Sequence, residues 1–276
     1  MTGLALLATG ALFAAAPAEN EAHRLAMRIA RQGPRPAASR AEARVHTLVR
    51  ERFRAAGLGV RVQRFGVPGL GRSRNVIGTI GGRGRCLRIV MAHTDSVPDG
   101  PGANDNASGV GVLGALAPRL AHARRPCKVW LVATGAEERL YTGSPDHLGA
   151  LALARRVRSR GLAGRLQWAL SLDEVGRDRP FWLRSPAQRP RRGVETAILA
   201  AARRVGMQVS FVRDEGSGNS DHREFNLLGM PAAKLGVGAG GEPCRHTACD
   251  RPRRLDPHSL RLARRIAERA LLLRAP

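Results

Sequence analysis

The stretch CLRIVMAHTDS, residues 86–96, gives the strongest indication of the fold. Its first seven residues form a short, mainly apolar run, and a second run of the same kind, CKVWLVA, occupies residues 127–133. Short apolar runs without polar alternation are typical of strands that are buried on both faces of a parallel sheet. Between the two runs, residues 107–116 are small and apolar, which suits a helix lying close to a sheet. This strand–helix–strand pattern predicts an α/β fold.

The alternation of strands and helices extends along the rest of the chain. Further short runs predict strands at residues 75–80, 166–172, 209–212 and 231–237. Three helix starts carry capping signals, which are Ser39-x-x-Glu42, Ser144-Pro145 and Asp256-Pro257. Residues 184–192, rich in Arg and Pro, are expected to form a surface loop. Together these patterns predict a three-layer α/β sandwich with a mixed, mostly parallel central sheet.

The composition is that of an ordinary globular chain with a strongly basic charge. Of the 276 residues, 46 are Lys or Arg and 22 are Asp or Glu, for a net charge of +24. Only Lys128 and Lys234 are lysines, and the arginines are scattered along the sequence. Such a uniform Arg bias is more typical of genome composition than of a binding site, and the basic and aromatic motifs of RNA-binding modules are absent. We therefore expect no nucleic-acid partner.

The N-terminus has features of a targeting segment. Residues 4–16 are largely Leu and Ala and lead into Ala16-Pro17-Ala18, a small-residue cleavage pattern. The basic region that usually comes first is missing, so a buried N-terminal helix is the alternative. We expect an export signal over residues 1–18, then a single domain over residues 19–276 that is secreted or held in the cell envelope; the atypical signal keeps a cytoplasmic location open. No run of 18 apolar residues occurs, so no transmembrane anchor is expected.

Polar residues follow the predicted strands at the points where the strands end. They are His93, Asp95, Glu137, Glu138, Asp173 and His246. Ligands of open α/β sheets bind outside the carboxyl ends of the strands, so one crevice can collect these groups. A further carboxylate, Asp105, lies where a loop enters a helix, within GANDNASG at residues 102–109.

Histidines and carboxylates in one crevice form a ligand set suited to zinc. Three carboxylate ligands and a bridging hydroxide would balance two divalent cations, which lets such a site form in a partly dry cleft. The adjacent Glu137 and Glu138 allow two roles, because one can bind metal while the other faces the substrate as a general base. Each residue alone also has an ordinary interpretation, as a helix cap, a turn or a solvated surface group.

Six motifs in order carry a resemblance to a known family. They are AHTDS (92–96), GANDNASG (102–109), EERLYTGS (137–144), LDEVG (172–176), SDH (220–222) and HTACD (246–250). Together they resemble the two-zinc aminopeptidases of the bacterial leucyl aminopeptidase type. The resemblance covers roughly residues 75–256. It implies a zinc site at the carboxyl ends of the strands, with two zinc ions per chain.

The resemblance also implies which residues hold the ions. It assigns His93 and Asp173 to one zinc, Glu138 and His246 to the other, and Asp105 to the bridge between them. These five assignments are transferred from the matching motif positions of the family.

The remaining roles concern catalysis. The family pattern makes Glu137 the general base, and Asp95 the carboxylate that orients a ligand histidine. The implied activity is that of an exported metallo-exopeptidase. A bridging, zinc-activated water would release N-terminal residues from peptides or proteins with a free N-terminus. A monomer is expected.

The four cysteines receive different interpretations. Cys244 and Cys249 flank His246, and family members can have a bridge here. In an exported chain a disulfide would stiffen this loop, with free thiols or extra metal ligands as alternatives. Cys86 and Cys127 begin two predicted strands and are expected to be free thiols in the core.

Several residues keep open or ordinary interpretations. Some family members carry Tyr before the ligand histidine, whereas this chain has Arg245, which can stabilise an oxyanion, contact substrate or point to solvent. The motif at residues 220–222 is not expected to be a catalytic triad, because neighbours in sequence seldom face one another productively. Ordinary structural or surface roles are expected for His23, His46, His122, His147 and His258.

Three other functions share this scaffold. A glutaminyl cyclase, an acyltransferase usually with one zinc, is the main alternative; Asn104, Asn106 and Gly143-Ser144 look more like the peptidases, and Arg245 replaces the Trp that cyclases tend to carry. A non-catalytic binding module would be expected to lack the base or a ligand. A carboxypeptidase or amino-sugar hydrolase of the same clan is the third alternative.

Overall fold

The two apolar runs at residues 86–92 and 127–133 lie side by side at the centre of one sheet. The computed structural model describes residues 21–177, 181–186, 192–214, 219–238 and 241–274. The strands in these ranges are β1 (Gly59–Val67), β2 (Gly71–Ile80), β3 (Leu87–His93), β4 (Lys128–Thr134), β5 (Leu166–Asp173), β6 (Trp182–Pro186), β7 (Ser210–Asp214) and β8 (Ala232–Gly236). The predicted export signal falls outside the described residues.

The order of strands across the sheet is β1-β2-β4-β3-β5-β8-β6-β7. The inner strands β4, β3, β5 and β8 run parallel to one another. Antiparallel pairs lie toward the edges, between β1 and β2, β2 and β4, and β6 and β8. The predicted mixed, mostly parallel sheet is therefore confirmed. Because the four inner strands are parallel, their carboxyl ends meet along one edge of the sheet.

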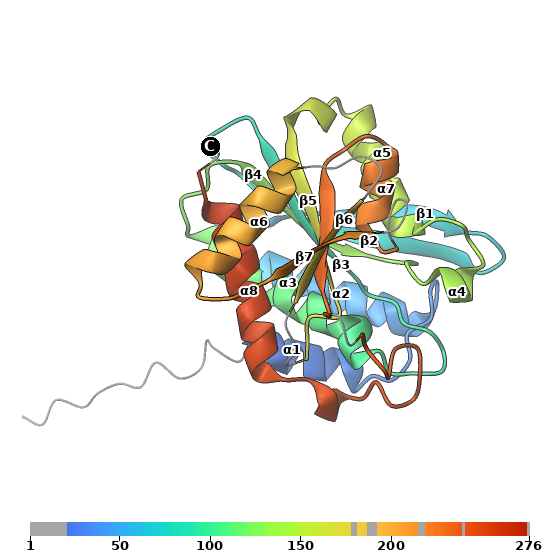
Figure 1. Cartoon of the computed structure of the whole chain (residues 1–276). Coiled ribbons are helices and arrows are strands. Elements are labelled where there is room, and N and C mark those ends of the chain that lie inside the picture. Colours follow the sequence, from blue (N-terminus) through green and yellow to red (C-terminus); the bar gives the residue numbers. More distant parts are fainter. Residues whose placement is uncertain (1–20, 178–180, 187–191, 215–218, 239–240, 275–276) are drawn as a thin grey trace, which may run out of the picture.

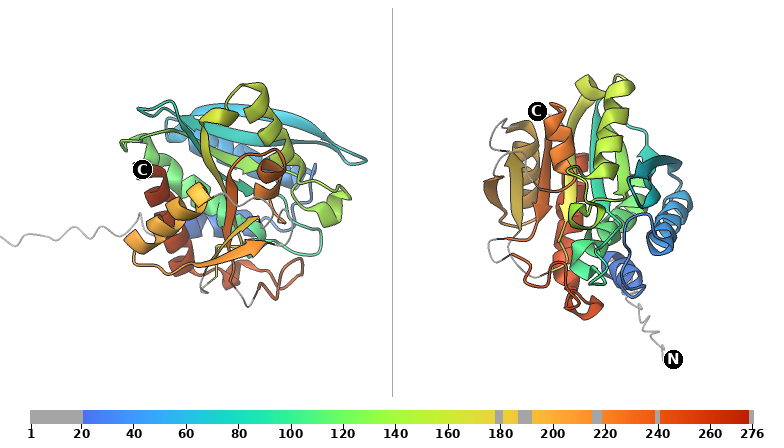
Figure 2. Two further views of the ribbon diagram at one scale, coloured as in Figure 1. Left: turned by 45° about the horizontal axis from the view of Figure 1, so that its top comes forward. Right: turned by 90° about the vertical axis from the view of Figure 1, so that its right-hand side faces the viewer.

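Helices cover both faces of the sheet (Figures 1 and 2). They are α1 (Glu21–Ala30), α2 (Arg40–Ala55), α3 (Ser108–Ala121), α4 (Arg139–Thr142), α5 (Leu148–Ser159), α6 (Arg192–Arg204), α7 (His222–Leu227) and α8 (Pro257–Leu272). Helices α5 and α7 pack on one face. Helices α2, α3, α6 and α8 pack on the other, where α1 lies against α3. This arrangement is the predicted three-layer sandwich.

Strand β3 shows why a continuous apolar run is needed at the centre. Val90 and Ala92 belong to the core on the side of α3, whereas Ile89 and Met91 belong to the core on the side of α5. All four side chains are fully buried. Since successive side chains of a strand point to opposite faces, a strand covered on both faces takes mainly apolar residues, and the buried Arg88 of β3 is accommodated by hydrogen bonds to Gln167 and to backbone oxygens of α8.

Helix α3 approaches the sheet closely because its first turn is made of small residues. A Cβ atom on Gly109 would lie only 2.3 Å from the carbonyl oxygen of Leu172 in β5. Only glycine permits this approach without moving the backbone. The contact fixes the start of α3, and with it the loop that carries Asp105, against the end of β5.

The helix signals at Ser39 and Asp256 are confirmed, and the one at Ser144 is misplaced. Ser39 Oγ accepts a hydrogen bond from the backbone N–H of Glu42 at 3.1 Å, and the Asp256 carboxylate caps α8. Helix α5 begins only at Leu148, after Ser144-Pro145. A local capping signal shows that a helix is near, but tertiary contacts decide where it begins.

Two further predictions are wrong. Residues 184–186 belong to strand β6 instead of a loop, because they pair with β7 and β8; residues 187–191 lie outside the described residues. Cys86 and Cys127 are joined by a disulfide and are not free thiols, with their Cα atoms 4.8 Å apart. The pairing of Leu87 with Lys128 in adjacent strands brings the two cysteines together, and nothing local to either cysteine encodes this neighbourhood.

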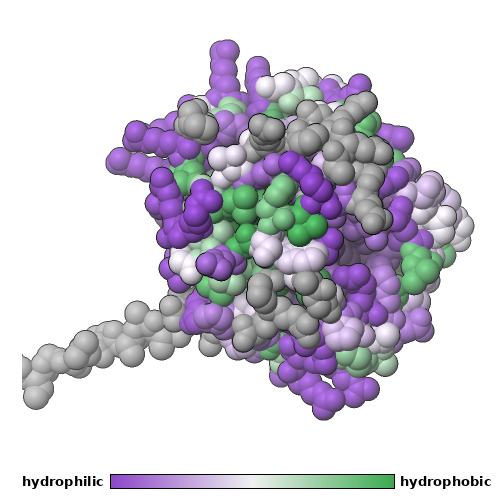
Figure 3. Space-filling model, in the orientation of Figure 1, coloured by the Kyte–Doolittle hydropathy of each residue, from purple (hydrophilic) through white to green (hydrophobic). Residues whose placement is uncertain are grey.

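The exterior of the molecule is largely hydrophilic. Figure 3 shows a face on which hydrophilic residues surround a smaller apolar area. Within the described part of the chain, the search for a helix with the length and hydropathy of a membrane span finds none.

Candidate metal centre and active site

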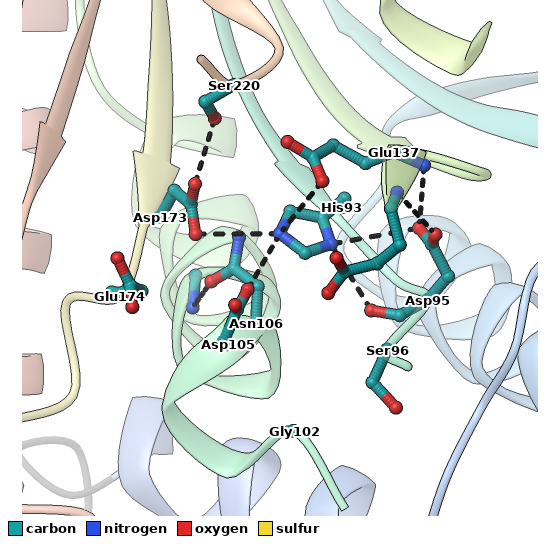
Figure 4. Close-up of polar contacts among 12 residues, drawn as sticks. His93, Asp95, Ser96, Gly102, Asp105, Asn106, Glu137, Asp173, Glu174 and Ser220 are labelled. Carbon is teal, nitrogen blue, oxygen red and sulfur yellow. Dashed lines mark hydrogen bonds and ion pairs between the residues drawn. The ribbon is translucent and has the colours of Figure 1, made fainter. Parts of the chain in front are cut away.

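The predicted site residues converge at the carboxyl ends of the inner strands. His93 and Asp173 are the last residues of β3 and β5. Glu137 and Glu138 follow β4, and Asp105 lies in the loop that enters α3. Figure 4 shows Asp105, Glu137 and Asp173 turned toward the imidazole of His93. The site thus forms where buried strands end and polar side chains become possible.

Asp105 is shared between two groups of possible metal ligands. One of its carboxylate oxygens, Oδ1, lies 3.1 Å from Nε2 of His93, and Asp173 Oδ1 lies 3.5 Å from that nitrogen. The other oxygen, Oδ2, lies 3.3 Å from Nε2 of His246, which is 3.0 Å from Glu138 Oε2. We call these the His93 trio (His93, Asp105, Asp173) and the His246 trio (Asp105, Glu138, His246).

The donor atoms of both trios fit zinc. Tetrahedral zinc with bonds of about 2.0–2.1 Å places its ligand atoms about 3.3 Å from one another. Three buried atoms of the trios, His93 Nε2, Asp173 Oδ1 and Glu138 Oε1, have no well-formed hydrogen bond among the described residues. Buried polar atoms are normally paired, since an unpaired one costs about 1–3 kcal/mol. These atoms point to a bound cation as their partner.

A third grouping, of His93, Glu137 and Glu138, also falls within reach of one ion. Glu137 Oε2 lies 4.0 Å from His93 Nε2, farther than the nearest oxygens of Asp105 and Asp173. Its other oxygen, Oε1, is 3.0 Å from Nδ1 of His147. Glu137 is therefore held beside the two trios as a carboxylate with a different partner.

His147 was expected to have an ordinary role, but it lies in the pocket against Glu137. Its Nδ1 contacts both the carbonyl oxygen and the carboxylate of Glu137. Burial lowers the pKa of His147, but the charge and hydrogen bonds of Glu137 outweigh burial and raise it to about 9. No spacing in the sequence pointed to this contact, because His147 belongs to the irregular segment before α5.

The Asp95 carboxylate holds the paired glutamates in place. Its two oxygens accept hydrogen bonds from the backbone N–H groups of Glu137 at 3.1 Å and Glu138 at 3.0 Å. Nδ1 of His93 lies 3.2 Å from the backbone oxygen of Asp95 and 3.7 Å from its carboxylate. The Asp95 segment thus orients the His93 ring chiefly through its backbone and the two glutamates through its side chain.

Three further residues hold the proposed ligands in place from behind. Asp173 Oδ2 accepts hydrogen bonds from Lys234 Nζ at 2.6 Å and Ser220 Oγ at 2.9 Å. The carboxylate of Asp250 accepts hydrogen bonds from the backbone N–H groups of Asn104 and Asp105. Asp250 ends one of the six motifs, but its role was not predicted, and Lys234 belongs to none of them.

The electrostatics of the site favour bound positive charge. Burial raises the pKa of Glu138 to about 8, and the neighbouring Asp105 carboxylate adds to the rise. Hydrogen bonds to Asp105 and Glu138 raise the pKa of His246 to about 10. Burial lowers the pKa of His93, but the surrounding carboxylates, Glu137 first, outweigh it and raise the pKa well above 6.5. Such a cluster retains protons strongly, and a divalent cation can replace them.

Arg245 has a definite partner in the structure. Its guanidinium donates to the Glu174 carboxylate through Nε, at 2.7 Å, and through Nη2. Glu174 directly follows Asp173 and also lies 3.5 Å from Lys234 Nζ. Arg245 therefore belongs to a charged wall of the site and is not a side chain directed only into solvent.

Cys244 and Cys249 form the disulfide that the sequence suggested, with their Cα atoms 5.2 Å apart. The bridge closes a short loop around His246, whose φ of 58° lies in the left-handed region. Because a non-glycine residue rarely adopts this conformation, the surrounding loop must hold it.

The motif at residues 220–222 does not form a triad. Asp221 accepts a hydrogen bond from Thr134 at 2.6 Å, and His222 contacts Asp214 at 2.9 Å. His46 is buried in the fold and contacts Thr94 at 2.9 Å, which agrees with its expected structural role.

The site opens into a cavity of about 350 Å³. Its described lining residues are Asp105, Glu137, Glu138, Arg139, Leu140, His147, Asp173, Glu174, Asn219, Lys234, Arg245 and His246. Four of the five predicted ligands therefore face this cavity together with Glu137. The fifth, His93, is fully enclosed. The arrangement can hold two cations and present a carboxylate beside them, which suits metal-assisted hydrolysis.

Comparisons with solved structures agree on the fold. An aminopeptidase from Aneurinibacillus sp. strain AM-1 superposes with a TM-score of 0.82 at 19% identity, covering 94% of this chain and 96% of that one. A glutaminyl cyclase from Bacteroides thetaiotaomicron superposes with a TM-score of 0.79 at 19% identity, covering 92% and 97%. At these identities the likeness establishes the fold and leaves the reaction open.

Sequence comparisons establish the family. A probable lipoprotein aminopeptidase, LpqL, from Mycobacterium tuberculosis (strain ATCC 25618 / H37Rv) is 31% identical over 189 residues, which are 61% of this chain and 35% of that protein. The chain spans between about a third and a half of the length of the curated relatives it matches. The family model described as peptidase family M28 matches residues 75–271, a range that contains both trios and the Glu137 carboxylate. The chain therefore belongs to peptidase family M28.

Proposed function

We propose that this protein is a zinc aminopeptidase that holds two zinc ions and removes residues from the N-terminus of peptides. The observation that carries the proposal is the sharing of Asp105 between the His93 trio and the His246 trio. A carboxylate whose two oxygens face separate ligand groups suits a pair of adjacent cations. Family membership and the aminopeptidases among its relatives support the same activity.

Different residues of the chain have different roles in the proposed catalysis. Zinc ions at the two trios would supply activation of a water molecule and polarisation of the scissile carbonyl. Glu137 lies beside the trios with its Oε1 held by His147, so its Oε2 is available to take the proton of the attacking water and return it to the leaving amine. Asp95 keeps Glu137 and Glu138 in position through their backbone N–H groups.

The main alternative is glutaminyl cyclisation, and two of the similar solved structures are glutaminyl cyclases. The His246 trio and the His93 trio each supply three donors, which favours a two-zinc peptidase over a cyclase that usually uses one zinc. We further propose that residues 19–276 form one peptidase domain that acts outside the cytoplasm as a monomer. The two disulfides support that location, because such bridges persist in oxidising compartments.

The test is hydrolysis of a panel of aminoacyl-anilides by zinc-loaded protein, together with measurement of bound zinc. Glu137→Gln should keep two zinc ions and lose at least 10²-fold in kcat, as expected for a missing general base. Glu51→Gln, an exposed glutamate on α2, is the matched control and should leave both values unchanged. Absence of hydrolysis with two ions bound would reject the aminopeptidase. Release of a cyclised product from a peptide with N-terminal Gln would identify the cyclase instead.

A further inference from the structure

A charged wall lines the cavity beside the metal ligands. It consists of Glu174, Lys234 and Arg245. Figure 4 shows Glu174 next to Asp173, at the side of the site away from Asp95. Glu174 follows the ligand Asp173 in sequence, and Arg245 precedes the ligand His246. Glu174 and Arg245 are therefore fixed to the same backbone segments as two of the proposed ligands, and the wall lines the same cavity.

Arg245 has donor capacity left over. Its Nε and Nη2 are engaged by Glu174. No acceptor for its Nη1 is present among the described residues, and 43% of the side chain is exposed. Since a guanidinium can donate five hydrogen bonds in a planar fork, an acceptor in the cavity can bind the free edge of Arg245.

A second cation stands at the mouth of the same cavity. Arg139 directly follows the ligand Glu138, and its guanidinium donates to the carbonyl oxygen of Pro145 and the side-chain oxygen of Asn219. Within the described part of the chain it has no carboxylate partner. Arg139 thus adds a positive charge to the lining without a carboxylate counter-ion of its own.

Few of the described lining residues have apolar side chains. The single aliphatic side chain among the described lining residues is Leu140, which is 77% exposed at the mouth. An apolar substrate side chain would thus be placed against the Arg245–Glu174 ion pair and would remove water from it without replacing any hydrogen bond, which is unfavourable.

The charge of the loaded site also favours an anion. The described lining residues include five carboxylates and three cationic side chains. Two bound divalent cations and a bridging hydroxide would turn this excess of two negative charges into an excess of one positive charge, with the histidines counted as neutral. A negatively charged substrate group would be attracted to this cavity.

We propose that the cavity selects peptides whose N-terminal residue carries a carboxylate side chain, Asp or Glu, and that Arg245 and Arg139 are the residues that recognise it. This inference rests on the proposed aminopeptidase function and names its substrate class. Arg245 binds the carboxylate from the wall, and Arg139 adds long-range attraction at the mouth.

The first test compares anilides of Glu with Gln and of Asp with Asn, because each pair differs in charge and little in shape. Zinc-loaded protein should cleave the acidic member at least about tenfold better in kcat/KM, the ratio expected for one charge-assisted hydrogen bond. Leu and Lys anilides should be poorer than Glu. A preference for Leu, or equal cleavage of Glu and Gln, would overturn the proposal.

Variants assign the recognition to particular residues. Arg245→Gln should bring the Glu/Gln ratio close to one, and Arg139→Gln should lower it several-fold. Arg119→Gln is the matched control, because Arg119 is 42% exposed and donates to both oxygens of Glu268 far from the cavity. If Arg245→Gln and Arg139→Gln both keep their zinc and the wild-type ratio, these residues do not recognise the carboxylate.

A binding measurement separates this proposal from the proposed function. The hydroxamates of L-glutamate, L-glutamine and L-leucine are titrated into the zinc-loaded protein by calorimetry, which needs no turnover. Tighter binding of the glutamate compound, with no anilide cleaved, would reject the aminopeptidase and retain the acidic subsite. Equal binding of all three would reject the subsite. The dipeptide Leu-Leu and its C-terminal amide are titrated as well. If the protein distinguishes these two but not the glutamate and glutamine compounds, it recognises a C-terminal carboxylate, and the assignment to a side chain is overturned.

Discussion

The ammonium group of Lys234 lies 2.6 Å from Oδ2 of Asp173, and both side chains are buried. This ion pair occupies one oxygen of a carboxylate whose other oxygen belongs to the His93 trio. Lys234 therefore restricts Asp173 to binding through Oδ1. It also places a fixed positive charge close to the position of a cation, where charges of like sign repel.

Removing that charge should strengthen metal binding at the His93 trio. In Lys234→Met, we expect a zinc ion at the His93 trio to bind at least tenfold more tightly, measured by competition with a chromophoric chelator. The metal-free variant should be less stable by about 3 kcal/mol or more, because it leaves buried carboxylates without their cation. Lys128→Met alters the only other lysine, which is exposed at the far end of β4, and serves as the control. Weaker zinc binding in Lys234→Met would contradict this account.

The Asp95 carboxylate should matter for turnover through the paired glutamates. In Asp95→Asn, one of the two carboxylate oxygens becomes an N–H donor that faces a backbone N–H group. We expect kcat to fall about 10–100-fold, the usual effect of losing a group that orients metal-site residues. Asp99→Asn, an exposed residue of the same loop, should retain full activity. Unchanged kcat in Asp95→Asn would show that the two backbone contacts are dispensable.

The two disulfides should differ in what they stabilise. The bridge between Cys86 and Cys127 closes a loop with a sequence separation of 41, for which loop-closure entropy predicts about 4 kcal/mol. Replacing both cysteines with Ala should lower the free energy of unfolding by about 2–4 kcal/mol in denaturant titrations. A loss below 1 kcal/mol would mean that the variant without these two cysteines already has a compact denatured state.

The short loop closed by Cys244 and Cys249, with a separation of 5, should contribute about half as much to stability. Replacing this pair with Ala is instead expected to weaken zinc binding, because the loop holds the ligand His246. Equal zinc affinity in the two double variants would argue against this role of the loop.

His46 should make the protein sensitive to acid. Burial lowers the pKa of its imidazole to about 3, whereas the unfolded value is about 6.5. As the pH falls, the unfolded chain therefore binds this proton at a higher pH than the folded chain does. The stability that neutral His46 contributes is fully present above pH 6.5 and is lost as the pH falls from 6.5 toward 3, at about 1.4 kcal/mol per pH unit.

The check is the difference in unfolding free energy between wild type and His46→Gln from pH 7 to pH 4. The Gln amide retains an N–H donor toward Thr94 but does not titrate. The unfolding free energy of the variant should therefore fall less steeply with decreasing pH than that of the wild type, by about 1.4 kcal/mol per pH unit. His122→Gln, at an exposed position, should follow the wild-type curve. Parallel curves for wild type and His46→Gln would show that His46 is not the sensitive group.

The sequence was sufficient for the centre of the sheet and for the convergence of the proposed ligands in one place. Strands β3, β4 and β5 are buried on both faces, so their apolar runs stop where the strands stop, and the first polar residues mark the site. His93, Glu137 and Asp173 could be placed in one crevice for this reason. Strand β6 was missed because its Arg- and Pro-containing sequence, at residues 182–186, has the composition of a loop and is a strand only through its pairing partners.

Other errors concern contacts between distant segments. The pairing of Cys86 with Cys127 depends on which strands are neighbours, and the roles of His147 and Lys234 depend on where irregular backbone carries them. No local pattern encodes such information. The family motifs supplied the identity of the ligands, but they contained neither the Lys234 ion pair nor the contact of Arg245 with Glu174.

The ligands of both trios come from segments that run from the end of β3 to the loop after β8, and Asp105 joins them all. No fragment that lacks either end of this span contains a complete centre. The chain must therefore collapse, pair its strands and dock its last loop before the proposed metal centre is complete. The centre is acquired late in folding. On the proposed function, a partly folded chain of this kind would therefore cleave no peptide until the whole fold is assembled.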